Sequence, residues 1–86
     1  MSATTAEGIT EQEVRSTLAR LLREELSWQG DLPQGELAEA FDSVGLLTLV
    51  VAIEDHFGIS FDEFDEQAIT TIDEVVALVL ERVRVA

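Results

Sequence analysis

Residues 41–58 read FDSVGLLTLVVAIEDHFG, and this stretch predicts one well-delimited helix. Asp42 is a favourable N-cap because its carboxylate accepts hydrogen bonds from free N–H groups of the first helical turn. Apolar residues then recur at offsets of three, four, seven and eleven, which places them on one helix face. Gly58 supplies the C-terminal stop, so we expect the helix to end near Phe57. The apolar stripe consists of Leu46, Leu49, Val50, Ile53 and Phe57.

The segment before this helix predicts another helix and a long connection. Thr10 and Glu13 have the spacing of a capping box, and apolar residues follow at helical spacing, which predicts a helix over residues 11–26. Residues 27–41 contain two glycines and a proline, so they form a connection with room for a helical turn over 36–40. We expect this connection to be pinned to the core by Trp28, Leu32, Leu37 and Phe41.

The segment after Gly58 predicts a short helix and a longer last one. The acidic stretch 62–68 is long enough for one short helix. Thr71 and Glu74 repeat the capping-box spacing before a valine-rich run, which predicts a helix over residues 72–84. Valine also favours strands, but the cap signals favour the helix. The expected core anchors of the short helix are Phe61, Phe64 and Ile69.

Length and pattern together predict an all-α fold, a small four-helix bundle of three longer helices and one short helix. The chain has 86 residues, enough for one hydrophobic core but not for two. Residues 1–9 are small and polar, so we expect a flexible tail before a single domain over residues 10–86. The start lacks the features of a signal peptide and no apolar run reaches membrane-spanning length, so we expect a cytoplasmic protein without membrane contact.

The charge balance indicates what the chain binds. Eighteen acidic residues against five arginines and no lysine give a net charge of −13, which argues against nucleic acid as a partner. The electric field of this negative charge attracts a basic protein partner. Alternatively, the charge simply keeps a small domain soluble and monomeric, and composition does not decide between these two interpretations.

Residues for catalysis or metal binding do not form a recognisable set. There is no cysteine, and the single histidine, His56, follows Ser43 by thirteen residues on the same predicted helix, about 20 Å away. Ser43 also lacks a G-x-S-x-G context, so we exclude nucleophilic catalysis. A calcium loop starting at Asp62 fails because its third and sixth positions are Phe64 and Gln67. We assign no catalytic residue and no metal site.

Ser43 has a position that suits an attachment point, a role that does not require a base to activate its hydroxyl. At the first turn of a helix, free N–H groups and the positive end of the helix dipole stabilise a negative group, so a phosphodiester on this hydroxyl is well tolerated. The ordinary alternative is that Asp42 and Ser43 only cap the helix.

From Phe41 to Arg82 the chain resembles an acyl carrier protein. The D-S-[LM] motif of that family corresponds here to Asp42-Ser43-Val44, and residues 46–57 resemble its second helix, with the E-x-x-F ending at 54–57. Thr70-Thr71 resembles the start of its last helix. The first helix agrees in general pattern.

This resemblance implies that a phosphopantetheinyl transferase attaches 4′-phosphopantetheine from coenzyme A to Ser43 in a magnesium-dependent reaction. The terminal thiol then carries an acyl or aminoacyl group as a thioester, and the chain is a substrate of enzymes rather than an enzyme. Asp42 caps the helix and presents Ser43 to the transferase. The further partners implied are an acyltransferase or adenylating ligase, and a ketosynthase or other pathway enzyme.

The resemblance also implies a docking face on the exposed side of the second helix. The alternative is that its apolar members are core, which requires a helix buried on nearly all sides. Gly45 departs from the acids that fatty-acid carriers often place there, so we expect Gly45→Asp to change partner selectivity more than stability. The predicted partner-binding residues are Val44, Gly45, Leu47, Val51, Glu54 and Asp55.

The cargo and pathway follow from analogy alone. Residues 62–65 resemble a stretch of free-standing carriers that load D-alanine, so an amino acid is a possible cargo. We expect a discrete carrier in a specialised-metabolite pathway of polyketide or nonribosomal type, with fatty-acid and cell-envelope pathways open. The alternative function is an unmodified acidic helical adaptor that binds a basic protein, in which Ser43 only contributes to the cap.

Overall fold

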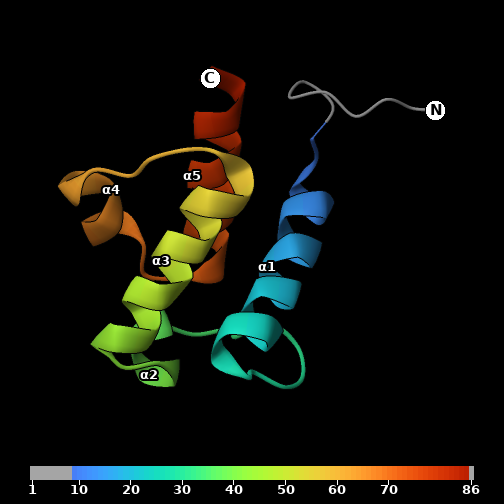
Figure 1. Cartoon of the computed structure of the whole chain (residues 1–86), viewed down its shortest axis with the longest axis vertical. Coiled ribbons are helices and arrows are strands. Elements are labelled where there is room, and N and C mark those ends of the chain that lie inside the picture. Colours follow the sequence, from blue (N-terminus) through green and yellow to red (C-terminus); the bar gives the residue numbers. More distant parts are fainter. Residues whose placement is uncertain (1–8, 86) are drawn as a thin grey trace.

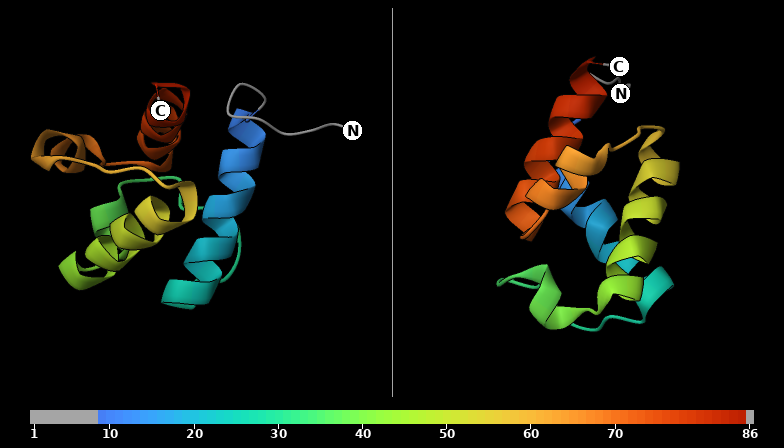
Figure 2. Two further views of the ribbon diagram at one scale, coloured as in Figure 1. Left: turned by 45° about the horizontal axis from the view of Figure 1, so that its top comes forward. Right: turned by 90° about the vertical axis from the view of Figure 1, so that its left-hand side faces the viewer.

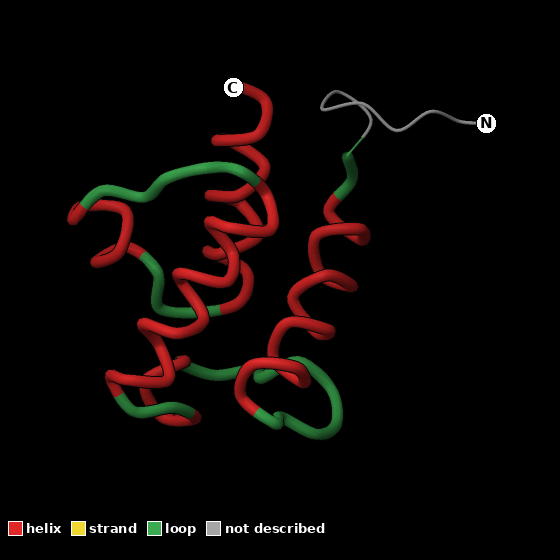
Figure 3. Tube along the Cα trace, in the orientation of Figure 1, coloured by secondary structure: helices red, strands yellow, loops and turns green. Residues whose placement is uncertain are grey.

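The computed structural model of the protein describes residues 9–85, and this part of the chain contains five helices (Figure 1). The flexible tail expected over residues 1–9 falls, apart from Ile9, outside the described residues. Residues 9–85 contain no strand, so the all-α prediction is confirmed (Figure 3). The helices are α1 (Glu11–Leu26), α2 (Leu37–Ala40), α3 (Ser43–Phe57), α4 (Glu63–Ala68) and α5 (Ile72–Val85).

The three longer helices form the bundle, and the two short ones lie in its connections. The two views of Figure 2 show α1 beside both α3 and α5, and the helix contacts agree. The predicted helical turn before α3 is α2, and α4 is the predicted short helix. In Figure 1, α3 lies between α1 and α4, so it has one flank toward each. This placement matters because α3 carries most of the candidate site.

The core is apolar and draws on all three long helices. In α3, Leu49 and Ile53 are fully buried, while the other predicted stripe residues are half-buried and pack against the core. Trp28 stacks in a tilted pair with Phe41 at 5.1 Å between ring centroids, which holds the first connection as predicted. The buried residues are Val14, Leu18, Leu21, Leu22, Leu37, Leu49, Ile53, Phe61, Ile72, Val75, Val76 and Val79.

The caps explain why the helices begin where they do. Thr10 and Glu13 form the predicted capping box, with each backbone N–H bonded to the other side chain at 2.9 and 3.1 Å. At the start of α5 only half of the predicted box forms. The N–H of Glu74 donates to the Thr71 hydroxyl, but the Glu74 carboxylate accepts from Thr70, one residue earlier than a capping box requires.

Phe64 is not a core anchor, and that prediction is wrong. Its side chain is 81% exposed, whereas Phe61 is buried and Ile69 packs against the core. The α4 helix is instead held by an acidic capping box between Asp62 and Asp65 and by an ion pair of Asp65 with Arg82 of α5. Because Asp65 faces the protein, Phe64 lies about 100° around the helix and points away.

Candidate functional site

Ser43 is the first residue of α3, and its side chain is exposed. Asp42 caps the helix: its Oδ1 accepts from the N–H of Gly45 at 2.8 Å, and its carbonyl accepts from Leu46 at 2.9 Å. Among residues 9–83, no acceptor bonds the N–H of Ser43 or Val44. Such free donors at the positive end of the helix dipole favour a negative group beside the Ser43 hydroxyl.

Ser43 also lies on the edge of a mostly apolar groove of about 340 Å³. The groove runs along the flank of α3 that faces α4, where Glu66 is its one charged lining residue. A volume of this order accommodates a small organic group. The residues that line it besides Ser43 are Leu37, Leu46, Leu47, Leu49, Val50, Ile53, Glu66 and Ile69.

Gly45 is closely surrounded by other parts of the chain. A Cβ atom at this position would lie 3.3 Å from both the Asp42 Oδ1 cap oxygen and the Phe41 Cβ, and 3.8 Å from a methyl group of Leu26. A side chain at position 45 would thus need Phe41 and the Asp42 carboxylate to shift by a few tenths of an ångström. We therefore expect Gly45→Asp to lower the stability of the fold as well as to change partner selectivity.

The exposed face of α3 carries three of the predicted partner-binding residues. Val44, Leu47 and Val51 are 72%, 58% and 47% exposed, which contradicts the alternative that they belong to the core. Asp55 is exposed beyond them. A continuous apolar strip of this kind is typical of a binding surface.

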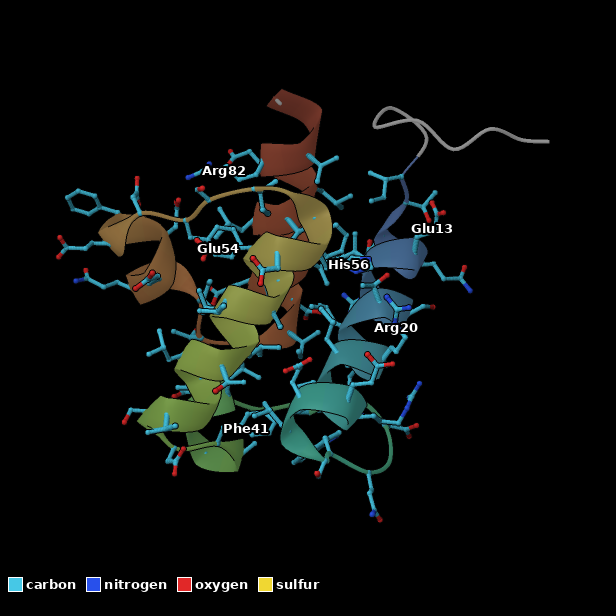
Figure 4. The ribbon with its side chains drawn as sticks, viewed as in Figure 1. Glu13, Arg20, Phe41, Glu54, His56 and Arg82 are labelled. Carbon is cyan, nitrogen blue, oxygen red and sulfur yellow. The ribbon has the colours of Figure 1, made fainter. Side chains whose placement is uncertain are left out.

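Glu54 and Asp55 have different roles, although they are adjacent in the sequence. Glu54 is half-buried, and its Oε2 accepts a hydrogen bond of 2.7 Å from the N–H of Phe61. Its carbonyl accepts from Gly58 and Ile59, so this one residue ties the end of α3 to the connection that follows. Figure 4 shows Glu54 on the flank of α3 toward α4. Glu54 is therefore a structural residue, and Asp55 is the one whose carboxylate is free on the surface.

His56 lies at the opposite end of α3 from Ser43, on the flank toward α1 (Figure 4). Its Nδ1 is 3.3 Å from the Nη2 of Arg20. Since a guanidinium only donates, Nδ1 is the acceptor in this contact. His56 therefore has no geometric relation to the Ser43 hydroxyl.

The exposed face of α3 is extended by two residues of α1, which the sequence did not predict to be part of it. Leu21 and Glu25 line a second groove, of about 540 Å³, between α1 and α3. From α3 the groove is lined by residues that include Leu47, Val51 and Asp55. The helical periodicity of α1 predicts a buried Leu21, but which helix stands opposite Glu25 is decided by tertiary packing.

The two carboxylates with lowered pKa values lie in the first turns of α4 and α5 rather than at the start of α3. Hydrogen bonding from the backbone of Asp62, and then the Arg82 guanidinium, lower the pKa of Asp65. The hydroxyl and N–H of Thr70 lower the pKa of Glu74.

Residues 9–83 contain no group of three potential metal ligands. In the described part of the chain, no helix combines the length and apolarity that crossing a membrane requires.

Comparison with known families identifies the chain's class. A family profile described as a phosphopantetheine attachment site matches residues 12–79, which run from the first turn of α1 through α2, α3 and α4 into the first half of α5. The chain belongs to the acyl carrier protein family. Acyl carrier proteins hold covalently attached 4′-phosphopantetheine, carry acyl groups on it, and are generally not catalytic. They work with a phosphopantetheinyl transferase and with pathway enzymes.

A solved structure shares this carrier fold. The acyl carrier protein from Thermotoga maritima matches with a TM-score of 0.73 over 86% of this chain and 91% of that one, at 18% sequence identity. No curated protein sequence matches the chain. The first turn of α3 fits the prosthetic group of an acyl carrier protein, because an exposed hydroxyl, two free N–H donors and an apolar groove meet there.

Proposed function

We propose that Ser43 is the residue to which 4′-phosphopantetheine is attached, and that residues 10–86 form a single carrier domain. The observation that supports this most strongly is the meeting of three features at one point: an exposed hydroxyl, free N–H donors for a phosphate, and a groove for an apolar group. When bound, the group supplies a thiol that carries an acyl or aminoacyl cargo as a thioester.

The residues of the chain position the acceptor and do not activate it. Asp42 fixes the first turn of α3, which holds the Ser43 oxygen outward and keeps the donors of Ser43 and Val44 free for phosphate oxygens. The bond from Ser43 Oγ to the phosphorus of the phosphopantetheine unit forms as the pyrophosphate P–O bond of coenzyme A breaks, with adenosine 3′,5′-bisphosphate as the leaving group. The hydroxyl proton leaves to a base of the transferase, because His56, the one imidazole of the chain, lies at the far end of α3.

The groove toward α4 supports a carrier of acyl or aminoacyl groups. Its walls are leucine, valine and isoleucine side chains next to Ser43, so a bound apolar chain is shielded from water there. We place this carrier in a specialised-metabolite pathway of polyketide or nonribosomal type, where it serves an acyltransferase or adenylating ligase and a ketosynthase or other pathway enzyme. The likeness of residues 62–65 to D-alanyl carriers favours testing amino acids as cargo.

The loading test uses the holo protein. Adenylating enzymes with their amino acids, and acyltransferases with malonyl-type donors, are offered to the wild type and to Ser43→Ala, and thioester formation is followed by mass. The carrier function predicts loading by one of these classes in the wild type and none in Ser43→Ala with an unchanged helical CD spectrum. An unmodified adaptor would bind its basic partner equally well in both, and that result would reject the carrier function.

A further inference from the structure

The groove between α1 and α3 is separate from the groove beside α4, and the two lie on opposite flanks of α3. Its floor includes the buried Leu21 of α1 and the half-buried Ala52 of α3, and its rim carries the exposed Leu47 and Val51. At about 540 Å³ it has room for one large apolar side chain, and it is built by two helices. An α3 strip that binds partners by itself would leave this hollow unfilled.

The charged residues around this groove determine which kind of side chain from a partner can bind in it. Glu25 of α1 and Asp55 of α3 both line it with exposed carboxylates. The basic residue among those that line the groove is His56, and its Nδ1 contacts Arg20 of α1 rather than either carboxylate. With a net charge of −13 behind them, the two carboxylates attract a basic group.

Leu47 separates the two grooves. It contributes to the lining of both, and more than half of its side chain is exposed. The flank toward α4 has Ser43 at its edge, whereas Ser43 does not line the groove toward α1. The α1–α3 groove is thus left for a second occupant while the prosthetic arm and cargo use the other side.

We propose that the α1–α3 groove is the docking site for partner enzymes, which insert an apolar side chain between Leu47 and Val51 with a Lys or Arg next to it, between Glu25 and Asp55. This inference rests on the proposed function and extends it, because it makes α1 part of the docking surface. The first partner is the phosphopantetheinyl transferase, which must bind every copy of the chain before any cargo is loaded.

The test measures kcat/KM for the modification of four surface variants by a phosphopantetheinyl transferase with coenzyme A and magnesium. Glu25→Lys and Val51→Ser alter the groove. Glu63→Lys and Phe64→Ser are the matched controls, since they make the same changes in charge and polarity at exposed positions of α4. CD spectra establish that all four are folded, as expected for exposed side chains.

The groove variants should each lower kcat/KM by about tenfold through a higher KM, with kcat retained. The controls should stay within about twofold, and the loss in Glu25→Lys should shrink as salt is raised. Equal losses in Glu25→Lys and Glu63→Lys, or a loss in Phe64→Ser as large as in Val51→Ser, would overturn the docking site while the carrier function stands. A wild type that is never modified would instead overturn the carrier function.

Discussion

The hydrogen bond between Glu54 and Phe61 predicts a loss of stability when Glu54 is replaced, and the adjacent residue Asp55 provides the control. Glu54 Oε2 accepts from the N–H of Phe61 at 2.7 Å, and Phe61 is buried. Glu54→Ala leaves that backbone donor without a partner, and an unsatisfied buried donor costs about 1–3 kcal/mol. We expect the free energy of unfolding to fall by about 2 kcal/mol, which lowers Tm by roughly 8–16 °C in a domain of this size.

Asp55→Ala is the matched control. Asp55 is exposed and lies near the C-terminal end of α3, where an acid interacts unfavourably with the helix dipole, so its removal should change stability by less than about 0.5 kcal/mol. Glu54→Gln keeps an acceptor oxygen but loses the charge, so it should cost about 1 kcal/mol or less. The expected order, from the most to the least stable variant, is thus Asp55→Ala, Glu54→Gln and Glu54→Ala.

The assay is urea unfolding followed by far-UV CD, with ΔG and the m-value fitted for each variant. An unchanged m-value shows that the surface exposed on unfolding is the same, so a shift in midpoint reports stability alone. If Glu54→Ala and Asp55→Ala were equally stable to within about 0.5 kcal/mol, the structural role of Glu54 would be refuted, and Glu54 would return to the partner-binding face.

Three further predictions concern helix ends. Asp42→Ala removes the cap bond to Gly45 and should lower the free energy of unfolding by about 1 kcal/mol, measured by urea unfolding; no change would mean that the cap is replaced by water. Gly45→Asp should lower Tm in a thermal melt, because its Cβ meets Phe41 and the cap oxygen, and an unchanged Tm would contradict the crowding. Asp65 and Glu74 have lowered pKa values, so their contribution to stability is present above pH ~4 and is lost as the pH falls further. Stability of Asp65→Asn, measured between pH 7 and 3, should therefore fall less steeply than that of the wild type; parallel curves would refute this.

Local signals in the sequence predict α1, α3, α4 and α5 well, because each of these helices begins at a side chain that caps it, whereas α2 has no such cap. Thr10, Asp42 and Asp62 all bond to the backbone three residues on, and such bonds depend on neighbours in the chain. The start of α5 shows the limit of this reasoning, because the Glu74 carboxylate accepts from the N–H of Thr70 rather than, as the spacing predicts, from that of Thr71.

The remaining features depend on contacts between distant residues, which local patterns do not contain. Phe64 faces outward because Arg82, seventeen residues after Asp65, holds Asp65 on the inward side. Glu54 is bonded within the fold because the connection after α3 brings Phe61 back to it. Gly45 and the groove beside Glu25 both depend on where α1 ends relative to α3, and no spacing within one helix shows this.

The most direct test of the central claim is the intact mass of the purified chain after incubation with a broad-specificity phosphopantetheinyl transferase, coenzyme A and magnesium. Ser43→Ala and Ser60→Ala are treated in parallel, since Ser60 is another exposed serine outside the site. We predict a gain of one phosphopantetheinyl unit, with one new titratable thiol, in the wild type and Ser60→Ala but not in Ser43→Ala. A gain in Ser43→Ala, or none in a well-folded wild type, would contradict the assignment of Ser43 as the attachment site.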